Sequence, residues 1–432
     1  MKFYSTQDKN YKVSFEQAVR QGLAPNGGLF MPEVIAPLPS QFWKDISSKT
    51  FNQIAFEVAD HFLKGSLPKN ELTKLIDYTI SFDAPLVEIE QNIFVLELFH
   101  GPTLAFKDFG ARFLSGLIGY FFTLYDSGTT ILVATSGDTG SAVANGFLNV
   151  KGTRVIILYP SGKVSEVQEK QFTTLGNNIT ALEIDGTFDD CQRLVKQAFS
   201  DDDLTKKLSL TSANSINIAR LIPQSFYYFN AFAQLENREL PLIFSVPSGN
   251  FGNLTAGLMA KKMGLPATKF IAATNINDVI PKYLMTNFFS PKPSEQTMSN
   301  AMDVGNPSNF FRMIDLYGND FEKLSHDVIG CSFTDDQTKL AMKEIWNSYN
   351  YLLDPHGAIG YLGLKEYLKK HKNYNGIFLE TAHPGKFKEV VENAIGESIT
   401  LPDVLMTFMK REKRSVQLTN SFEDFRIFLN KM

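Results

Sequence analysis

The chain has 432 residues, of which 44% are hydrophobic and 20% are charged, so it is not an intrinsically disordered protein. The formal net charge of −4, from 42 basic and 46 acidic residues, gives no indication of a nucleic-acid-binding surface. The longest uncharged apolar stretch, residues 113–125, is too short to span a bilayer. The opening MKFYSTQDKN lacks the features of a signal or transit peptide. We therefore expect a globular, cytoplasmic protein with neither a nucleic-acid nor a membrane partner.

Cysteine and histidine are used sparingly. The sequence contains two cysteines, Cys191 and Cys331, and six scattered histidines. Two cysteines cannot form a disulfide framework, and no metal-ligand spacing surrounds them. We expect no metal centre.

Residues 1–85 are expected to form a helical N-terminal region. Helical patterns cover residues 15–21, 39–63 and 69–80, and several prolines between residues 32 and 39 mark an irregular crossing.

From residue 86 onward, short apolar runs alternate with helical stretches. The runs are continuous, as expected for strands buried on both faces, and they cover residues 93–98, 131–134, 154–158, 179–184, 242–246, 270–273 and 377–379. Helical patterns cover 164–174, 188–199, 216–234 and 254–263. This alternation predicts an α/β fold with two open, mostly parallel sheets flanked by helices. A division near 236–240 would give domains over 86–235 and 236–432, with ligands bound at strand ends and in the cleft between the domains.

The loop after the 93–98 run, LFHGPTLAFKDFG, contains Lys107 in apolar surroundings. Burial disfavours a charged ammonium and lowers the pKa of a lysine, as an amine nucleophile requires. The alternative is a lysine near a helix start whose charged end reaches water. This segment alone leaves both interpretations open.

Two glycine-rich loops each lead from a strand into a helix. ATSGDTGSAVA follows the 131–134 run, and SVPSGNFGNLTAG follows the 242–246 run. Glycines allow close backbone approach, and a helix start presents free N–H groups to an anion. The second loop matches neither GxxxxGK[ST] nor GxGxxG, so it carries no nucleotide signature. Ordinary turns, with Asp138 or Thr139 capping the first helix, are the alternative.

A fourth loop, GIFLETAHPGKF, places Thr381 just beyond the 377–379 run, where a hydroxyl could contact a heteroaromatic ring. Alone, this loop is equally consistent with a capped turn. Together, the loops describe a reactive lysine and two anion-binding helix starts. This combination indicates pyridoxal phosphate, which needs a lysine, a phosphate holder and a partner for its ring nitrogen.

Five motifs resemble those of the threonine synthase family, in its bacterial and fungal branch. They are HGPTLAFKD, ATSGDTG, SANSINIAR, SVPSGNFGN and TAHPGKFKE, in that order, and FEQAVRQGLAPNGGLFMPE is similar to the family's amino-terminal region. The match covers nearly the whole chain. The resemblance implies fold type II of pyridoxal-phosphate enzymes, similar to the tryptophan synthase β subunit, with the cofactor in the interdomain cleft.

The resemblance also implies roles for individual residues. Lys107 would carry the cofactor, Asp138 would lie near its ring hydroxyl, and Thr381 would lie near its ring nitrogen. The cofactor phosphate would be held by Ser248, Gly249, Asn250, Phe251, Gly252 and Asn253. The substrate carboxylate would be bound by Ser136, Gly137 and Thr139, and the substrate phosphate by Asn214, Ser215, Asn217 and Arg220. Related enzymes often carry Asn in place of Asp138, so the protonation state of Asp138 stays open here.

The implied enzyme is a cytoplasmic lyase that converts O-phospho-L-homoserine and water to L-threonine and phosphate, the last step of threonine biosynthesis. Two alternatives are a pyridoxal-dependent serine/threonine dehydratase, which has no substrate phosphate to hold, and a non-catalytic threonine-synthase-like binding protein. The intact Lys107 and glycine loops disfavour the second alternative. The expected oligomeric state is a monomer or a homodimer.

Overall fold

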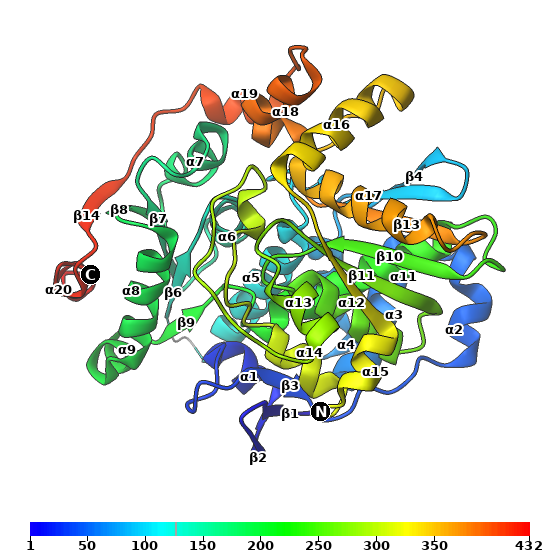
Figure 1. Ribbon diagram of the computed structural model, residues 1–432. Coiled ribbons are helices and arrows are strands. Elements are labelled where there is room, and N and C mark those ends of the chain that lie inside the picture. Colours follow the sequence, from blue (N-terminus) through cyan, green and yellow to red (C-terminus); the bar gives the residue numbers. More distant parts are fainter. Residues whose placement is uncertain (126–127) are drawn as a thin grey trace.

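Two mostly parallel sheets with helices packed around them form the body of the molecule (Figure 1). The structure is a computed structural model that describes residues 1–125 and 128–432. The six-stranded sheet has the order β12 (Val328–Ser332), β11 (Ala267–Thr274), β10 (Leu242–Pro247), β13 (Asn375–Glu380), β5 (Ile93–Glu97) and β4 (Leu86–Glu90). Its strands pair in parallel except for β4 with β5. The predicted α/β class is confirmed.

The five-stranded sheet is parallel throughout. Its order is β14 (Val416–Thr419), β8 (Ile179–Asp185), β7 (Thr153–Pro160), β6 (Thr129–Ala134) and β9 (Leu210–Ser212). All seven apolar runs predicted as strands coincide with strands of these two sheets, although the 93–98 run extends one residue beyond β5. Sequence analysis missed β4, β9, β12 and β14. Strand β9 is buried but has only three residues, and the other three are partly or largely exposed, so none shows a long apolar run.

The two sheets do not follow the predicted domain boundaries. Strands β4 and β5 precede the five-stranded sheet in sequence but pair into the six-stranded one, whereas β14, near the carboxyl end, pairs with β8 in the five-stranded sheet. A cut at 236–240 would therefore separate strands that belong together. The chain crosses between the sheets instead of completing one before it begins the other.

The N-terminal region is only partly helical, which corrects the prediction for residues 1–85. It opens with a three-stranded antiparallel sheet of β1 (Lys2–Ser5), β2 (Asp8–Ser14) and β3 (Phe30–Pro32). Strand β2 has the sequence DKNYKVS and is mostly exposed, so its pattern shows no buried face. Helix α1 (Phe15–Gln21) agrees with the predicted range and begins with a capping box between Ser14 and Gln17.

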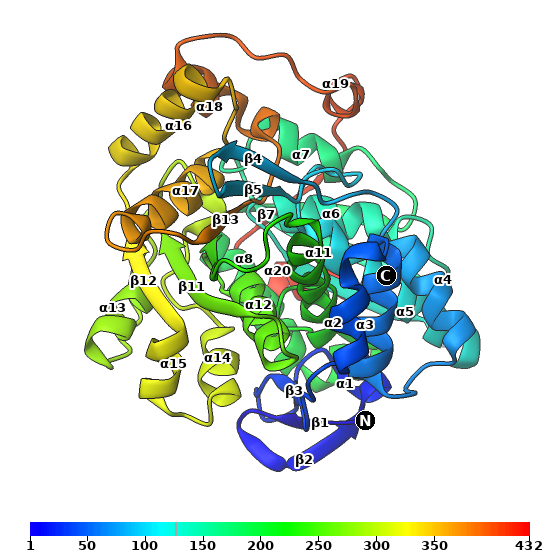
Figure 2. The ribbon, with the colours of Figure 1, turned by 90° about the vertical axis from the view of Figure 1, so that its right-hand side faces the viewer.

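The remaining N-terminal helices are α2 (Ser40–Asp45), α3 (Phe51–Leu63) and α4 (Lys69–Thr79). The predicted 39–63 helix is interrupted by a 3₁₀ turn, Ile46–Ser48, after which Thr50 forms a capping box with Gln53 and starts α3. Helix α3 packs against α11 (Phe226–Gln234), and α4 packs against α5 (Lys107–Tyr125), as Figure 2 shows.

The helices that enter the site follow the strands directly. They are α6 (Asp138–Phe147), α7 (Glu166–Thr173), α8 (Phe188–Ser200), α9 (Asp202–Leu208), α10 (Ile218–Leu221) and α12 (Gly252–Lys262). The predicted 216–234 helix is broken into α10, a 3₁₀ segment (Ile222–Ser225) and α11, because Pro223 has no N–H to continue the α-helical ladder.

The outer helices complete the fold. They are α13 (Val279–Thr286), α14 (Phe310–Leu316), α15 (Phe321–Asp327), α16 (Asp335–Tyr349), α17 (Pro355–Leu368), α18 (Lys388–Ile395), α19 (Asp403–Met409) and α20 (Phe422–Asn430). Within the described residues, no helix combines the length and apolar character needed to cross a membrane. The same residues hold no group of three or more His, Cys, Asp or Glu side chains suited to a metal ion.

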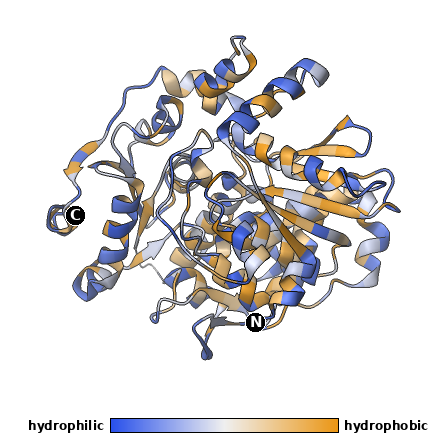
Figure 3. Cartoon of the chain, viewed as in Figure 1, coloured by the Kyte–Doolittle hydropathy of each residue, from blue (hydrophilic) through white to orange (hydrophobic). Residues whose placement is uncertain are grey.

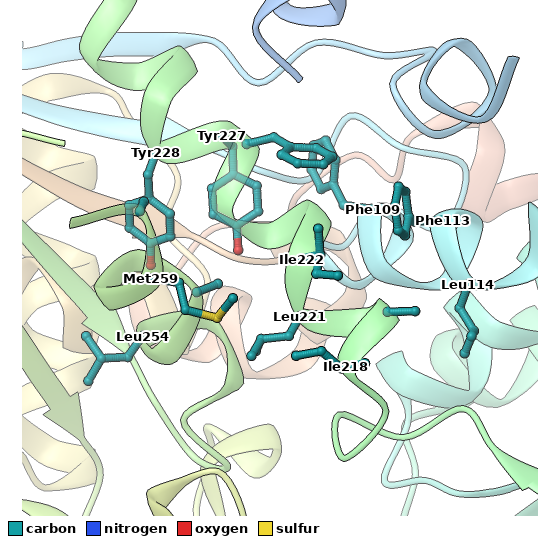
Figure 4. Close-up of a cluster of buried hydrophobic side chains, with 14 of the residues drawn as sticks. Phe109, Phe113, Leu114, Ile218, Leu221, Ile222, Tyr227, Tyr228, Leu254 and Met259 are labelled. Atoms are coloured by element: carbon teal, nitrogen blue, oxygen red, sulfur yellow. The ribbon is translucent and has the colours of Figure 1, made fainter. Parts of the chain in front are cut away.

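The main core lies where α5, α10, α11 and α12 meet. Figure 3 shows apolar residues concentrated in the strands and central helices, and Figure 4 shows the aromatic part of this core. Phe109 packs against Tyr227 with ring centroids 5.3 Å apart, and Tyr227 and Tyr228 lie beside each other on α11. Each buried aromatic ring stabilises the fold by about 1.5–3 kcal/mol. The core fixes the helix starts that face the site.

Candidate active site

A cavity of about 1490 Å³ lies between the two sheets, beyond the carboxyl ends of β6, β10 and β13. Most of the residues singled out in the sequence line it, namely Lys107, Ser136, Asp138, Thr139, Asn214, Ser215, Arg220, Ser248, Gly249, Asn250, Phe251, Gly252, Asn253 and Thr381. Gly137 and Asn217 do not. Parallel strands that end at one edge bring these loops together although they are far apart in sequence.

Lys107 is the first residue of α5, and its side chain lines the cavity with 16% of its surface exposed. Its Nζ lies 3.5 Å from Oδ2 of Asp138. The loop that leads into Lys107 is anchored by a hydrogen bond of 2.9 Å, which the N–H of Phe106 donates to the carbonyl oxygen of Thr381. Lys107 is thus not the exposed lysine of the alternative interpretation.

The surroundings of Lys107 favour the neutral amine. Burial lowers the pKa of Lys107 most strongly, and the cations Lys386 and Arg220 lower it further. Asp138 acts in the opposite direction but does not cancel these effects. A larger share of Lys107 is therefore a free amine at neutral pH than for a surface lysine.

Asp138 is buried and is held as a carboxylate. Its Oδ1 accepts a hydrogen bond from Nε2 of Gln168 at 2.8 Å and lies 2.7 Å from Nζ of Lys386. Burial alone would raise the pKa of Asp138, but Lys386 and Lys107 outweigh burial and hold this pKa below its usual range. The protonation state left open by the sequence is therefore the ionised one.

Lys386 was missed as a site residue, although it lies in the TAHPGKFKE motif. Its side chain is fully buried, and Nζ donates to the carbonyl of Thr103 at 2.8 Å in addition to pairing with Asp138. A signal was present, because Lys386 stands in a Gly-Lys-Phe context. The argument applied to Lys107, a lone cation among apolar neighbours, applies here as well.

The SGDTG loop uses some of its own donors for the turn. Oγ1 of Thr135 accepts from the N–H of Gly137 at 3.0 Å and from that of Gly140 at 2.8 Å. Gly137 has a φ of +141°, which suits glycine, so its place is structural. The N–H groups of Asp138 and Thr139, in the first turn of α6, remain for an anion.

The SGNFGN loop forms a tight cradle at the start of α12. Phe251 caps the helix with a left-handed backbone, φ +58°, a conformation that costs a bulky residue energy. A Cβ on Gly249 would lie 2.7 Å from the carbonyl oxygen of Ala301, so only glycine fits. Asn250 is already bonded within the protein, since its amide donates to Ser215 at 2.6 Å and accepts from Ser308.

Asn253 offers a donor that the protein itself does not use. Its Oδ1 accepts hydrogen bonds from the hydroxyls of Tyr227 and Tyr228, each at 2.7 Å. Its Nδ2 is buried and has no partner among the described residues. A buried orphan donor in a glycine cradle at a helix start fits a phosphate group.

Arg220 lies on α10 and is 3% exposed, so it is not a solvated surface charge. Burial lowers the pKa of Arg220 to about 10, which leaves it charged at neutral pH. One terminal nitrogen donates to the carbonyl of Ala213, and Nε has no partner among the described residues. Asn214 and Ser215 line the same cavity as Arg220, and Ser215 also lies beside the α12 cradle, since its Oγ accepts from Nδ2 of Asn250 at 2.6 Å. This part of the cavity suits a second anion.

Two nearby side chains, those of Asn217 and Arg312, form hydrogen bonds with backbone atoms. Asn217 caps α10 by accepting from the N–H of Ala219 and donates to the carbonyl of Val19 at 2.9 Å, which explains why it does not line the cavity. Arg312, missed in the sequence because its surroundings show an ordinary amphipathic helix, is fully buried. It donates to the carbonyls of Ser215 and Ile216 at 3.0 and 2.6 Å and so fixes the Asn214–Ser215 segment.

Family models match almost the entire chain. Residues 78–377 match the family described as pyridoxal-phosphate dependent enzyme, residues 2–80 match the threonine synthase N terminus, and residues 357–428 match the threonine synthase C-terminal family. The chain is similar to threonine synthase of Haemophilus influenzae, with 45% identity over 100% of both chains, and to that of Escherichia coli, with 46% identity over 94% of both.

Solved structures agree with these matches. The crystal structure of threonine synthase from Escherichia coli superposes with a TM-score of 0.94 at 43% identity and covers 100% of both chains. The pyridoxal-phosphate-bound threonine synthase from Brucella melitensis has a TM-score of 0.93 at 34% identity and covers 100% of this chain and 99% of its own. A tomato threonine deaminase, at 16% identity and a TM-score of 0.56, shares the fold alone. The predicted fold type II is confirmed, and the chain belongs to the threonine synthase family of pyridoxal-phosphate-dependent enzymes.

Proposed function

We propose that this protein converts O-phospho-L-homoserine and water into L-threonine and phosphate, with pyridoxal phosphate as its cofactor. The observation that carries the proposal is that one cavity is lined by a buried lysine and by two separate groups suited to anions. One group is the start of α12 and suits the cofactor phosphate. The other contains Arg220 and suits a phosphorylated substrate.

The residues present fit the cofactor. The cradle that begins at Ser248 and the free amide of Asn253 would hold its phosphate, Lys107 would hold its aldehyde carbon, and Thr381 would lie at its ring nitrogen. When bound, pyridoxal phosphate supplies a conjugated ring that takes up negative charge from the substrate carbons. Thr381 is uncharged, so it contributes a hydroxyl to the ring nitrogen instead of a full charge.

Lys107 is suited to move protons during the reaction. Its Nζ would accept the proton from Cα of the substrate and exchange protons at Cβ and Cγ, which requires an amine that is free at neutral pH. The lowered pKa of Lys107 meets this requirement. Asp138 lies 3.5 Å away and would orient the ammonium that forms after each proton is accepted.

Arg220 would bind the phosphate that leaves from Cγ. A guanidinium stabilises negative charge that increases as the carbon–oxygen bond breaks, so it contributes to the chemical step as well as to binding. The N–H groups of Asp138 and Thr139 would hold the substrate carboxylate at the start of α6. Water then adds its oxygen at Cβ, which gives threonine and inorganic phosphate in equal amounts.

The decisive experiment follows both products. Purified protein with O-phospho-L-homoserine should release phosphate and L-threonine in a 1:1 ratio, and Lys107→Ala should abolish both. L-Serine and L-threonine serve as control substrates for the dehydratase alternative. Formation of a 2-oxo acid from them, with no phosphate release from phosphohomoserine, would overturn the proposal. A cytoplasmic location and a monomeric or homodimeric state remain predictions.

A further inference from the structure

Lys107 and Lys386 both lie beside the carboxylate of Asp138, but they differ in burial and in their other contacts. Lys107 lines the cavity, whereas Lys386 is fully buried and does not. Nζ of Lys386 lies 2.7 Å from Oδ1 of Asp138 and 2.8 Å from the carbonyl of Thr103, both of which only accept hydrogen bonds. Lys386 thus forms a buried ion pair with Asp138 and is also anchored to the backbone. Nζ of Lys107 faces the other oxygen, Oδ2, at 3.5 Å.

The position of Lys386 connects the two sheets. It lies on the 3₁₀ segment Pro384–Phe387, after β13 of the six-stranded sheet, while Asp138 begins α6, after β6 of the five-stranded sheet. Thr103 belongs to the loop that leads into Lys107. Moving Lys386 would therefore disturb both the carboxylate and the loop that carries the reactive amine.

If Lys107 is protonated, positive charges outnumber negative charges in its surroundings. The charged groups that face it are Asp138 from α6, Lys386 from the 3₁₀ segment and Arg220 from α10. Asp108, the neighbour of Lys107 on α5, accepts from the N–H and hydroxyl of Thr103 at 2.9 and 2.6 Å, and its charge acts on Lys386 and Arg220. With Lys107 protonated, three cations would share two carboxylates, Asp138 and Asp108, in a buried site, and loss of the proton from Lys107 relieves the excess positive charge.

We propose that Lys386 is a positioning residue, which neutralises Asp138 permanently so that Lys107 remains the free amine of the pair. Lys386 does not touch the substrate. It acts on Lys107 by compensating the charge of Asp138 and by its own positive charge. The inference rests on Lys107 being the reactive amine of the proposed function but does not depend on the identity of the substrate.

The test measures the amine of Lys107 directly, in the full-length protein freed of cofactor. The rate at which 1-fluoro-2,4-dinitrobenzene labels the Lys107 peptide is followed by mass spectrometry as a function of pH, because only the free amine reacts. Lys386→Met removes the charge at similar length, and Lys386→Arg keeps it. Lys388→Met removes an exposed charge two residues away and is the matched control.

In Lys386→Met, Asp138 pairs with Lys107 alone, so the labelling midpoint should move to higher pH and labelling at pH 7 should slow on the order of tenfold. Asp138→Asn should move the midpoint to lower pH, since it leaves the cations uncompensated. Lys386→Arg and Lys388→Met should label like the wild type. A structural role would not produce shifts of opposite sign.

An unchanged midpoint in folded Lys386→Met, with folding checked by circular dichroism, would overturn the inference. If Lys386→Met does not fold, the double variant Lys386→Met/Asp138→Asn removes both charges of the buried pair. Its Lys107 should then label with a midpoint above that of Asp138→Asn, and equal midpoints would overturn the inference. Absence of threonine formation together with the expected shifts would contradict the proposed reaction but not this role of Lys386.

Discussion

The burial of Arg220 indicates a binding role that its residue type alone does not. On a surface, an arginine eight positions after a strand end is an ordinary solvated charge. Here it is 3% exposed, its one bonded terminal nitrogen serves the backbone of Ala213, and its Nε is an orphan. Asp108 acts on Arg220 electrostatically, but the described residues form no direct ion pair with it. Because a buried cation without a directly paired counterion is costly, a ligand anion explains its presence better than stability does.

Replacing Arg220 should therefore affect the reaction more than the fold. Arg220→Ala should lower kcat/KM for phosphohomoserine by about ten- to a hundredfold, corresponding to roughly 1.5–3 kcal/mol, with part of the loss in kcat. Inhibition by inorganic phosphate should weaken in parallel. Arg220→Lys should recover part of the loss, since it restores the charge without the planar fork. Unchanged kinetics, with cofactor content verified by absorbance, would remove Arg220 from the site.

The two tyrosines on α11 orient the amide of Asn253. Burial raises the pKa of Tyr227 and Tyr228 well above the usual value, so both hydroxyls remain donors and fill the two acceptor positions of Oδ1. Figure 4 shows both hydroxyls directed to the side of α12 that carries Leu254 and Met259. The amide nitrogen is left for the ligand.

Tyr227→Phe and Tyr228→Phe should each weaken binding of pyridoxal phosphate by roughly two- to tenfold, the range of one hydrogen bond. Binding of pyridoxal, which has no phosphate, should not change. Tyr283→Phe, a buried tyrosine on α13, is the control. Fluorescence titration of the cofactor-free protein measures both ligands, and equal weakening for both would show that the tyrosines do not act through a phosphate contact.

At the scale of the elements, two glycines at the start of α12 have different roles. The fold itself requires Gly249, whereas Gly252 has room for a side chain and faces the ligand site. A Cβ on Gly249 would collide with the backbone of Ala301 and Met302, whereas a Cβ on Gly252 would make ordinary contacts of 3.5 Å with Ser215 and Asn309. Sequence reasoning assigned both glycines to backbone approach by the phosphate. The structure shows that the protein itself already requires Gly249.

Gly252→Ala should therefore stabilise the cofactor-free fold by about 0.4–1 kcal/mol, because the unfolded chain loses freedom, yet weaken pyridoxal phosphate binding on the order of tenfold. Gly249→Ala should destabilise the fold itself, typically by about 1–3 kcal/mol. Urea unfolding and cofactor titration separate the two effects. Normal cofactor affinity in Gly252→Ala would place the phosphate elsewhere.

The strands predicted from the sequence are mostly buried on both faces, whereas several of the missed strands are exposed. Central strands such as β6 and β10 were predicted because their runs are apolar on both faces. Strands β2 and β14 are largely exposed and show no such run. Individual loops predicted most of the cavity lining, but Lys386 and Arg312 were missed, because their roles depend on partners more than eighty residues away in the chain.

At the scale of the whole molecule, the last residues close the five-stranded sheet. Strand β14 pairs with β8, and α20 places Phe425 and Leu429, both fully buried, in the core beneath that sheet. Figure 1 shows this segment crossing from α19 to the far side of α8. The sheet is incomplete without the carboxyl end.

Phe425→Ala should therefore destabilise the fold by about 3–5 kcal/mol, the cost of an emptied aromatic site. Ile427→Ala on the same helix should change stability by less than about 0.5 kcal/mol, since Ile427 is 44% exposed. The midpoints of urea unfolding compare the two. Similar effects would show that α20 is not anchored through its buried face.

The crossing of the chain between the sheets also has a consequence for synthesis on the ribosome. Neither sheet can be completed from a continuous stretch of nascent chain, since β5 must wait for β13 and β8 must wait for β14. Contacts between such distant segments are slow to form. Until translation ends, the edge of β8 that pairs with β14 has no neighbour, so we expect the nascent chain to be prone to aggregation during that interval.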